Sequence, residues 1–215
     1  MRLIKKVFII VFIIIIISLV IIILINNKVM PIYMNYAESE MERVVTTVIN
    51  KSVLECKIND DMFIIKNVNS NTIVDYDPMI INKIMSDISN KVYDNLKKVG
   101  DQDEEILKKY NLDKTVFNIP TGVIFKSILL NNLGPKVPVK LELISSVNSN
   151  IESKVTEYGI NNSLIEVNIK VNVTIKMILP TSSRNNKISV VVPLTVKIIQ
   201  GNIPEYYFGN LKRIN

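Results

Sequence analysis

The chain begins with an apolar run from Val7 to Ile25 whose one polar residue is Ser18 and which carries no charge. As a helix rising ~1.5 Å per residue, such a run just spans the ~30 Å hydrocarbon core of a bilayer. Apolar side chains surround this helix on all sides, which suits lipid better than a protein interior. The sequence therefore predicts a membrane anchor in residues 1–28, with the span at about 7–25.

The basic residues around the apolar run indicate its orientation. Arg2, Lys5 and Lys6 precede the run and Lys28 follows it, so the positive-inside rule leaves the N-terminus in the cytoplasm. Residues 29–215 would then form one extracytoplasmic domain of a single-pass membrane protein. A cleaved signal peptide is the alternative, but its apolar region is usually shorter and ends at small residues, which Ile25–Met30 lacks.

The charge and the cysteine content argue against nucleic-acid binding and exclude an intramolecular disulfide. The chain has 26 basic and 20 acidic residues, and removing the anchor's basic residues leaves a nearly neutral domain with no sign of nucleic-acid binding. Cys56 is the one cysteine, so an intramolecular disulfide is excluded. We expect Cys56 to be a small buried hydrophobe, with an intermolecular disulfide or a lipid-modified thiol as the alternatives.

Two amphipathic helices are predicted, over 35–57 and 78–99. Asn35 or Ser39 could cap the first, whereas Asp77 followed by Pro78 marks the start of the second and Gly100 its end. In each helix the residues expected in the core recur at three- and four-residue steps. They are Ala37, Met41, Val44, Val45, Val48, Ile49, Ser52 and Cys56, and then Ile81, Ile84, Met85, Ile88, Val92, Leu96 and Val99.

The segments between and after the helices carry turn signals. Met62–Lys66 and Thr72–Tyr76 flank a polar turn and predict a hairpin. The charged stretch 101–114 is expected to be a linker or loop. A short strand over 116–119 and a turn or short helix over 121–130 should follow it.

The clearest β pattern lies in residues 138–199, where apolar and polar residues alternate. Alternation with short turn-rich connections predicts an antiparallel meander with one dry and one wet face, and the two helices would cover the dry face. The fold class is therefore α+β. The inward-facing residues are expected to be Val139, Leu141, Leu143, Val147 and Ile151, then Ile165, Val167, Ile169, Val171, Val173, Ile175 and Met177, then Ile188, Val190, Val192, Leu194, Val196 and Ile198.

Most catalytic chemistry finds no support in this sequence. Without histidine there is no His-dependent triad or His-ligated zinc site, and S-x-x-K and phosphate-binding glycine motifs are absent. The acidic residues at 101–105 lack calcium-loop spacing, and Asp77 already caps a helix. We therefore expect no enzymatic activity, no cofactor and no metal site, although a carboxylate pair acting on sugar is left open.

Several blocks of the sequence resemble those of the sporulation protein YunB family of endospore-forming Firmicutes. These are Ile119-Pro120-Thr121-Gly122, Leu129–Val139, Glu157–Glu166, Val192-Pro193-Leu194 and Val196–Tyr207, with Ala37-Glu38 and Ile49–Val53 matching an earlier helix. The resemblance implies a role in endospore formation, with expression in the mother cell. It brings no catalytic or ligand residues with it.

Two hypotheses of function follow, with one set of site residues. The first is a non-enzymatic structural or assembly protein at the mother-cell and forespore envelope, contacting a protein partner or another copy through exposed strand edges. The second is an exported hydrolase or ligand-binding domain acting on peptidoglycan or lipid, for which two carboxylates in one cleft would be the sign. The residues expected to form turns or to contact a partner are Leu133, Gly134, Pro135, Pro138, Tyr158, Gly159, Asn161, Asn162, Gln200, Gly201 and Pro204.

Overall fold

A computed structural model describes residues 2–56, 62–68, 71–113, 117–125, 129–159 and 162–200. The chain divides into two compact units that both draw on its longest elements. Unit 1 comprises Met1–Val45, Lys97–Ile144 and Thr174–Asn186, and unit 2 comprises Thr46–Leu96, Ser145–Val173 and Lys187–Asn215. Helices and sheets are both present, so the predicted α+β class is confirmed. The single exported domain over 29–215 stays a prediction.

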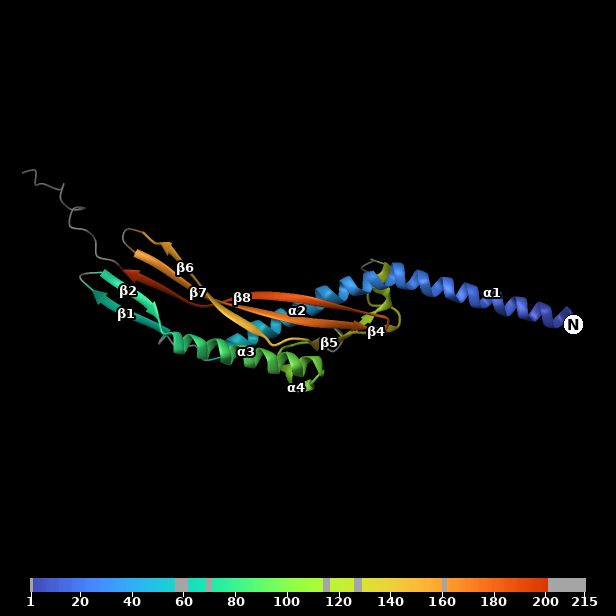
Figure 1. Cartoon of the computed structure of the whole chain (residues 1–215), viewed down its shortest axis with the longest axis horizontal. Coiled ribbons are helices and arrows are strands. Elements are labelled where there is room, and N and C mark those ends of the chain that lie inside the picture. Colours follow the sequence, from blue (N-terminus) through green and yellow to red (C-terminus); the bar gives the residue numbers. More distant parts are fainter. Residues whose placement is uncertain are drawn as a thin grey trace, which may run out of the picture. The chain divides into compact units, whose positions relative to one another are not determined.

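The N-terminal apolar run forms a helix, α1 (Arg2–Leu24), that continues through a π-helical turn, η1 (Ile25–Val29), into α2 (Met30–Glu55). The three elements follow one another as one continuous helix (Figure 1). Apolar side chains from Val7 to Leu24 are all exposed, between 46% and 77%. Among the described residues, this is the one helix long and apolar enough to cross a membrane.

The start of α2 differs from the sequence prediction. It begins at Met30, so Asn35 and Ser39 lie inside the helix and neither caps it. Pro31 has no N–H to donate to the preceding turn, and the wider π-helical turn directly before it is a local adjustment that keeps the chain helical. The predicted core stripe of α2 is confirmed from Ala37 to Ser52, whereas Cys56 is half-buried.

Within unit 1, the segment predicted to be a charged linker contains a helix, α4 (Glu104–Lys109). Asp103 caps it by accepting a hydrogen bond from the backbone N–H of Glu105 at 2.9 Å. Acidic residues in its first turn and basic residues in its last suit the helix dipole. The linker prediction was wrong because these charges surround an apolar cluster that is buried, comprising Ile106, Leu107, Tyr110 and Leu112.

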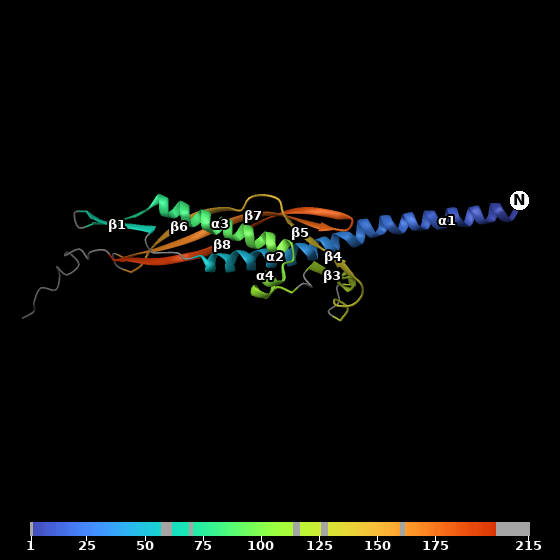
Figure 2. The same cartoon turned by 90° about the horizontal axis from the view of Figure 1, so that it is seen from below.

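Two short strands of unit 1, β3 (Asn118–Pro120) and β4 (Lys136–Pro138), pair antiparallel and lie side by side (Figure 2). A 3-10 helix, η4 (Thr121–Phe125), follows β3, in agreement with the expected strand and turn. A further strand, β5 (Lys140–Leu143), pairs antiparallel with residues 175–178 of β7 (Asn162–Leu179).

Unit 2 contains α3 (Pro78–Gly100) up to Leu96 and the predicted hairpin, formed by β1 (Phe63–Val68) and β2 (Asn71–Tyr76). The Asp77 cap is confirmed, because its Oδ1 accepts hydrogen bonds from the N–H groups of Met79 and Ile80 at 2.8 and 3.3 Å. The core stripe of α3 is buried from Ile84 to Val99, with Ile81 and Met85 half-buried.

The sheet of unit 2 is built on β7, which pairs with β6 (Asn148–Glu157) and β8 (Ser182–Gln200). Alternate residues of β7 are buried without interruption from Ile165 to Leu179, which confirms the strongest strand prediction. Ser149 of β6 donates from Oγ to the carbonyl oxygen of Met85 at 2.9 Å, and α3 therefore lies against this strand.

The last strand departs from the predicted alternation. Ile188 and Val192 are buried as expected, but Val196 and Ile198 are 57% and 55% exposed. Lys197 is half-buried instead, and its Nζ lies 4.7 Å from the centre of the Phe63 ring. Even-numbered residues of β8 thus face the interior up to Leu194, whereas from Val196 onward they face solvent. A strict two-residue alternation does not predict this change.

Candidate functional site

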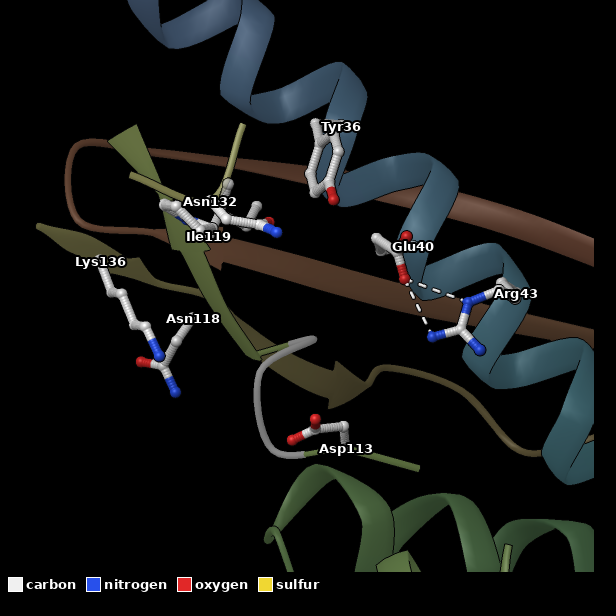
Figure 3. Close-up of a pocket in the computed structure, with 9 residues that line it drawn as sticks. Tyr36, Glu40, Arg43, Asp113, Asn118, Ile119, Asn132 and Lys136 are labelled. Atoms are coloured by element: carbon white, nitrogen blue, oxygen red, sulfur yellow. Dashed lines mark hydrogen bonds and ion pairs between the residues drawn. The ribbon is translucent and has the colours of Figure 1, made fainter. Parts of the chain in front are cut away.

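A polar groove in unit 1 is the candidate functional site. It runs between α2 on one side and the β3–β4 pair on the other, with Asp113, which follows α4, along its edge (Figure 3). Its volume of about 430 Å³ could admit a peptide segment or a sugar. The residues that line this polar groove are Tyr36, Glu40, Arg43, Asp113, Asn118, Ile119, Pro120, Asn132 and Lys136.

The α2 wall is formed by Tyr36, Glu40 and Arg43, whose spacing of four and three residues places them on one helix face. Arg43 donates from Nε and Nη2 to Glu40 Oε2 at 3.1 and 3.0 Å. Two donors on one carboxylate oxygen restrict both side chains more than a single contact would. Figure 3 shows this pair beside the Tyr36 ring on the same helix.

The opposite wall depends on the register of β3 and β4. Ile119 pairs with Val137 and Pro120 with Lys136, and backbone hydrogen bonds continue the contact beyond the strands. The N–H of Thr121 donates to the Pro135 carbonyl at 2.9 Å, and that of Gly122 to the Leu133 carbonyl at 2.8 Å.

Two glycines allow this close backbone approach. A Cβ atom at Gly122 would overlap the carbonyl oxygen of Leu130, because the two backbone segments lie in contact there. Gly134 has a φ of +89°, which other residues resist, and a Cβ there would overlap the Thr121 hydroxyl. The glycines of two separate sequence blocks therefore build one turn structure, which presents Asn132 and Lys136 to the polar groove.

The chemistry of the polar groove suits binding. It combines charges of both signs, two side-chain amides and a tyrosine ring around the buried Ile119 side chain. Such a surface can form hydrogen bonds with an extended polar chain at several points. No group of three His, Cys, Asp or Glu residues that could hold a metal ion occurs within the described part of the chain.

The polar groove also contains two carboxylates, Glu40 and Asp113. Glycoside hydrolysis needs two carboxyl groups ~5–10 Å apart that face the same bond. The Glu40 carboxylate is directed at Arg43 in an ion pair of 3.0 Å, and Figure 3 shows Asp113 on the other side of the opening. The ion pair holds the Glu40 carboxylate against a residue of its own helix.

The structure brings some of the predicted site residues together here and leaves others apart. Leu133, Gly134, Pro135 and Pro138 belong to the turn and strand that carry Asn132 and Lys136, and Leu133 is 57% exposed. Others lie in unit 2 or outside the described residues. Tyr158, Gly159 and Asn162 form the β6–β7 turn and Gln200 ends β8, all in unit 2, whereas Asn161, Gly201 and Pro204 are outside the described residues.

Sequence reasoning missed the α2 side of the site. Tyr36, Glu40 and Arg43 lie off the apolar stripe of α2, so the pattern assigned them to solvent. The one indication in the sequence was Tyr36, an aromatic residue on the polar face of a helix, and such a residue is weak evidence of a binding site by itself. Asp113 and Lys136 gave no signal, because only the folded chain brings them to the polar groove.

Comparison with known proteins gives two matches. The family model described as sporulation protein YunB matches residues 116–206, which include β3, β4 and the sheet strands from β5 onward. The protein named sporulation protein YunB from Bacillus subtilis (strain 168) is 31% identical over 192 residues, covering 86% of this chain and 74% of that protein. No solved structure matches the chain. The α2 wall of the polar groove lies outside the family-model match, and the β3–β4 wall lies inside it.

Proposed function

Because this chain belongs to the sporulation protein YunB family, we propose that it is a membrane-anchored, non-enzymatic protein needed for endospore formation. Its role is the assembly of the envelope between mother cell and forespore. The observation that carries the anchoring is the exposure of every apolar side chain from Val7 to Leu24. Exposed apolar area on this scale is stable in lipid and not in water.

The orientation is set by charge. Arg2, Lys5 and Lys6 hold the N-terminus in the cytoplasm, so α2 and the residues that follow it lie outside. In the mother-cell membrane this places residues 29–215 in the space that faces the forespore.

The polar groove is the contact site for a protein partner in this proposal. Its mixed charges and amides fit a polar segment of another protein. The ion pair of Arg43 with Glu40 orients these two side chains on the α2 wall. Within the described residues β8 pairs with β7 alone, and its other edge is a second contact, for a partner strand or another copy of the chain. Pro193 lacks an N–H and limits the length of any such pairing.

The test is a sporulation assay in cells whose own gene carries variants of the polar groove. Tyr36→Ala combined with Lys136→Glu should lower the yield of heat-resistant spores by at least tenfold, while vegetative growth and the amount of protein stay normal. Lys98→Glu, an exposed charge change on α3, is the matched control and should sporulate normally. Normal spore yields from the groove variant, with the protein present, would contradict the assignment of the polar groove.

The second candidate function is an envelope hydrolase or ligand-binding domain, and it rests on Glu40 and Asp113 lining one groove. Purified full-length protein would be incubated with peptidoglycan, and soluble fragments would be measured. Hydrolysis that disappears in both Glu40→Gln and Asp113→Asn would establish this function in place of assembly. We expect no release of fragments from either the natural chain or the variants.

A further inference from the structure

The connection between β3 and β4 presents an exposed apolar surface in unit 1. Phe125, at the end of η4, is 68% exposed, and Leu129 and Leu133 are 86% and 57% exposed. We call these three side chains the apolar tip. Leu129 is more exposed than any apolar side chain from Val7 to Leu24, the run that the chain is expected to place in lipid. Large apolar side chains exposed together mark a contact with a membrane or a partner.

Backbone contacts hold the apolar tip in place. The N–H of Gly122 donates to the Leu133 carbonyl at 2.8 Å, and the N–H of Leu133 donates to the Leu130 carbonyl at 2.9 Å. Residues three apart in a 3-10 helix lie on the same side, which puts Phe125 above Gly122 and so beside this contact. The exposed side chains are therefore presented together by one hydrogen-bonded turn.

The apolar tip lies on the side of unit 1 that leads into α1. Figures 1 and 2 both draw β3 and β4 beside α2, toward the end of that helix where α1 joins it. In Figure 3, Ile119 lies nearer than Asn118 to Tyr36, so β3 runs toward the start of α2. The connection that follows β3 therefore approaches the anchor.

The distance from the polar groove to the membrane can be covered by η4. Pro120, which precedes η4, lines the polar groove together with Tyr36. Tyr36 lies ~16 Å beyond Ile25 along the helix, and a headgroup layer of ~5–8 Å leaves ~8–11 Å between this level and the headgroups. The five residues of η4, at ~2.0 Å rise per residue, span ~10 Å. The connection is therefore long enough to carry Phe125 from the polar groove to the headgroup layer.

From these observations we propose that the apolar tip docks on the outer surface of the bilayer that anchors the chain. Phe125, Leu129 and Leu133 enter the boundary between headgroups and acyl chains, where apolar side chains are commonly buried. The contact continues the exposed apolar surface of α1, which belongs to the same unit. A second attachment beside α1 stops rotation of the chain about its anchor and so fixes the direction in which the polar groove opens. This inference rests on the membrane anchoring proposed above.

The experiment uses the full chain in phosphatidylcholine nanodiscs loaded so that each holds a single copy. A fluorophore on Leu129→Cys, in a Cys56→Ser background, reports on the apolar tip. Its quenching is measured with phosphatidylcholine that carries a nitroxide at the top of one acyl chain, and separately with iodide in the water. We expect strong quenching by the nitroxide lipid and weak quenching by iodide. The same label on Lys108→Cys, an exposed position of α4 in unit 1, should show the reverse.

Variants of the labelled chain assign the docking to named residues. Phe125→Ser combined with Leu133→Ser should lower the ratio of docked to undocked label at least ~tenfold, because two apolar side chains no longer leave water. Both residues are exposed in the fold, so the melting temperature in detergent should not change. Phe125→Leu keeps an apolar side chain and should retain the quenching. Ile144→Ser is the matched control, since it changes a 47% exposed apolar residue elsewhere in unit 1 and should leave the ratio unchanged.

The outcomes separate this inference from the anchoring itself. Protein that cannot be recovered in nanodiscs or in carbonate-washed membranes would refute the anchoring, and this inference with it. In well-incorporated protein, a Leu129 label that iodide quenches and the nitroxide lipid does not would refute the docking alone. A label shielded from both quenchers would show that protein covers the apolar tip, which also overturns the proposal. Equal effects of the double serine variant and of Ile144→Ser would show that the quenching does not depend on the apolar tip.

Discussion

Asn95 donates a hydrogen bond from Nδ2 to the Oγ of Ser52 at 2.9 Å, and both residues are buried in unit 2. The bond joins α3 to α2 among buried apolar residues of both helices. A buried polar pair of this kind is satisfied in one helix register and left unsatisfied in shifted ones. It therefore fixes how these two helices meet, whereas the surrounding valines and isoleucines supply most of the free energy.

Replacing Asn95 by leucine should lower the free energy of unfolding by about 1–3 kcal/mol, because the Ser52 hydroxyl then stays buried without this donor. The double variant Asn95→Leu with Ser52→Ala should recover part of the loss. Urea unfolding of the protein in detergent would measure both. Asp94→Ala, on the exposed neighbouring position, is the control and should change stability by no more than about 0.5 kcal/mol.

Gly122→Ala should disrupt the β3–β4 wall of the polar groove, because its Cβ would overlap the Leu130 backbone, which cannot move alone. Gly159 has a φ of +68° with open space around it, so Gly159→Ala should cost only the ~1–2 kcal/mol of a left-handed conformation. The melting temperature of Gly122→Ala should be well below that of Gly159→Ala. Equal melting temperatures would mean that the two backbone segments are not in contact.

Val171→Asp would place a carboxylate at a fully buried position of β7 and should cost several kcal/mol of the ~5–15 kcal/mol that stabilises a domain. Asn172→Asp, on the opposite face of the same strand, is the matched control and should change stability by about 0.5 kcal/mol or less. Lys170 is less suitable as a control because its Nζ pairs with Glu152 at 3.1 Å. Similar losses in the two variants would show that β7 is not buried on one side.

The sequence predicted those elements whose pattern is local. The alternation of β7 and the Asp77-Pro78 cap of α3 each depend on neighbouring residues, and both are confirmed. The start of α2 was misplaced because capping residues were favoured over the continuation of a helix through Pro31. The helix α4 was not predicted because its four charged residues outnumber its two buried apolar residues, Ile106 and Leu107.

The polar groove could not be predicted, because its walls come from segments far apart in the sequence. Tyr36 and Lys136 are brought together by tertiary contacts that no periodic pattern encodes. The change of burial parity in β8 has the same origin. Lys197 of β8 contacts the ring of Phe63, which belongs to the β1–β2 hairpin far away in the sequence. The alternation of residues within β8 carries no information on this contact.

Cys56 should react slowly with alkylating reagents near neutral pH. Burial raises the pKa of its thiol above the ordinary value, with Lys91 acting in the opposite direction. The folded chain thus holds the thiol proton more tightly than the unfolded chain, so this contribution to stability is complete below pH ~8.5 and is lost as pH rises through the folded pKa. Iodoacetamide rates against pH would measure it. Lys91→Gln should slow the reaction further, and Lys83→Gln should not.

A reporter fused after Asn215 should be active only if it functions outside the cytoplasm, because the basic residues precede the apolar run. Alkaline phosphatase activity would be compared with the fluorescence of a reporter that fails on export. Changing Arg2, Lys5 and Lys6 to glutamine should reduce the phosphatase signal, since the charge bias is lost. Bright cytoplasmic fluorescence from the natural sequence would reverse the proposed orientation.

The position of β8 after β7 in the chain has a consequence for synthesis. Every second side chain of β7 from Ile165 to Leu179 is buried, yet β8, one of its partner strands, is synthesised after it. Until β8 arrives, an apolar strand with an open edge is present in a nascent chain whose apolar N-terminal helix was made first. A stop codon before Ser182 should therefore produce a protein that is degraded or aggregates, because the sheet can fold only after β8 has been synthesised.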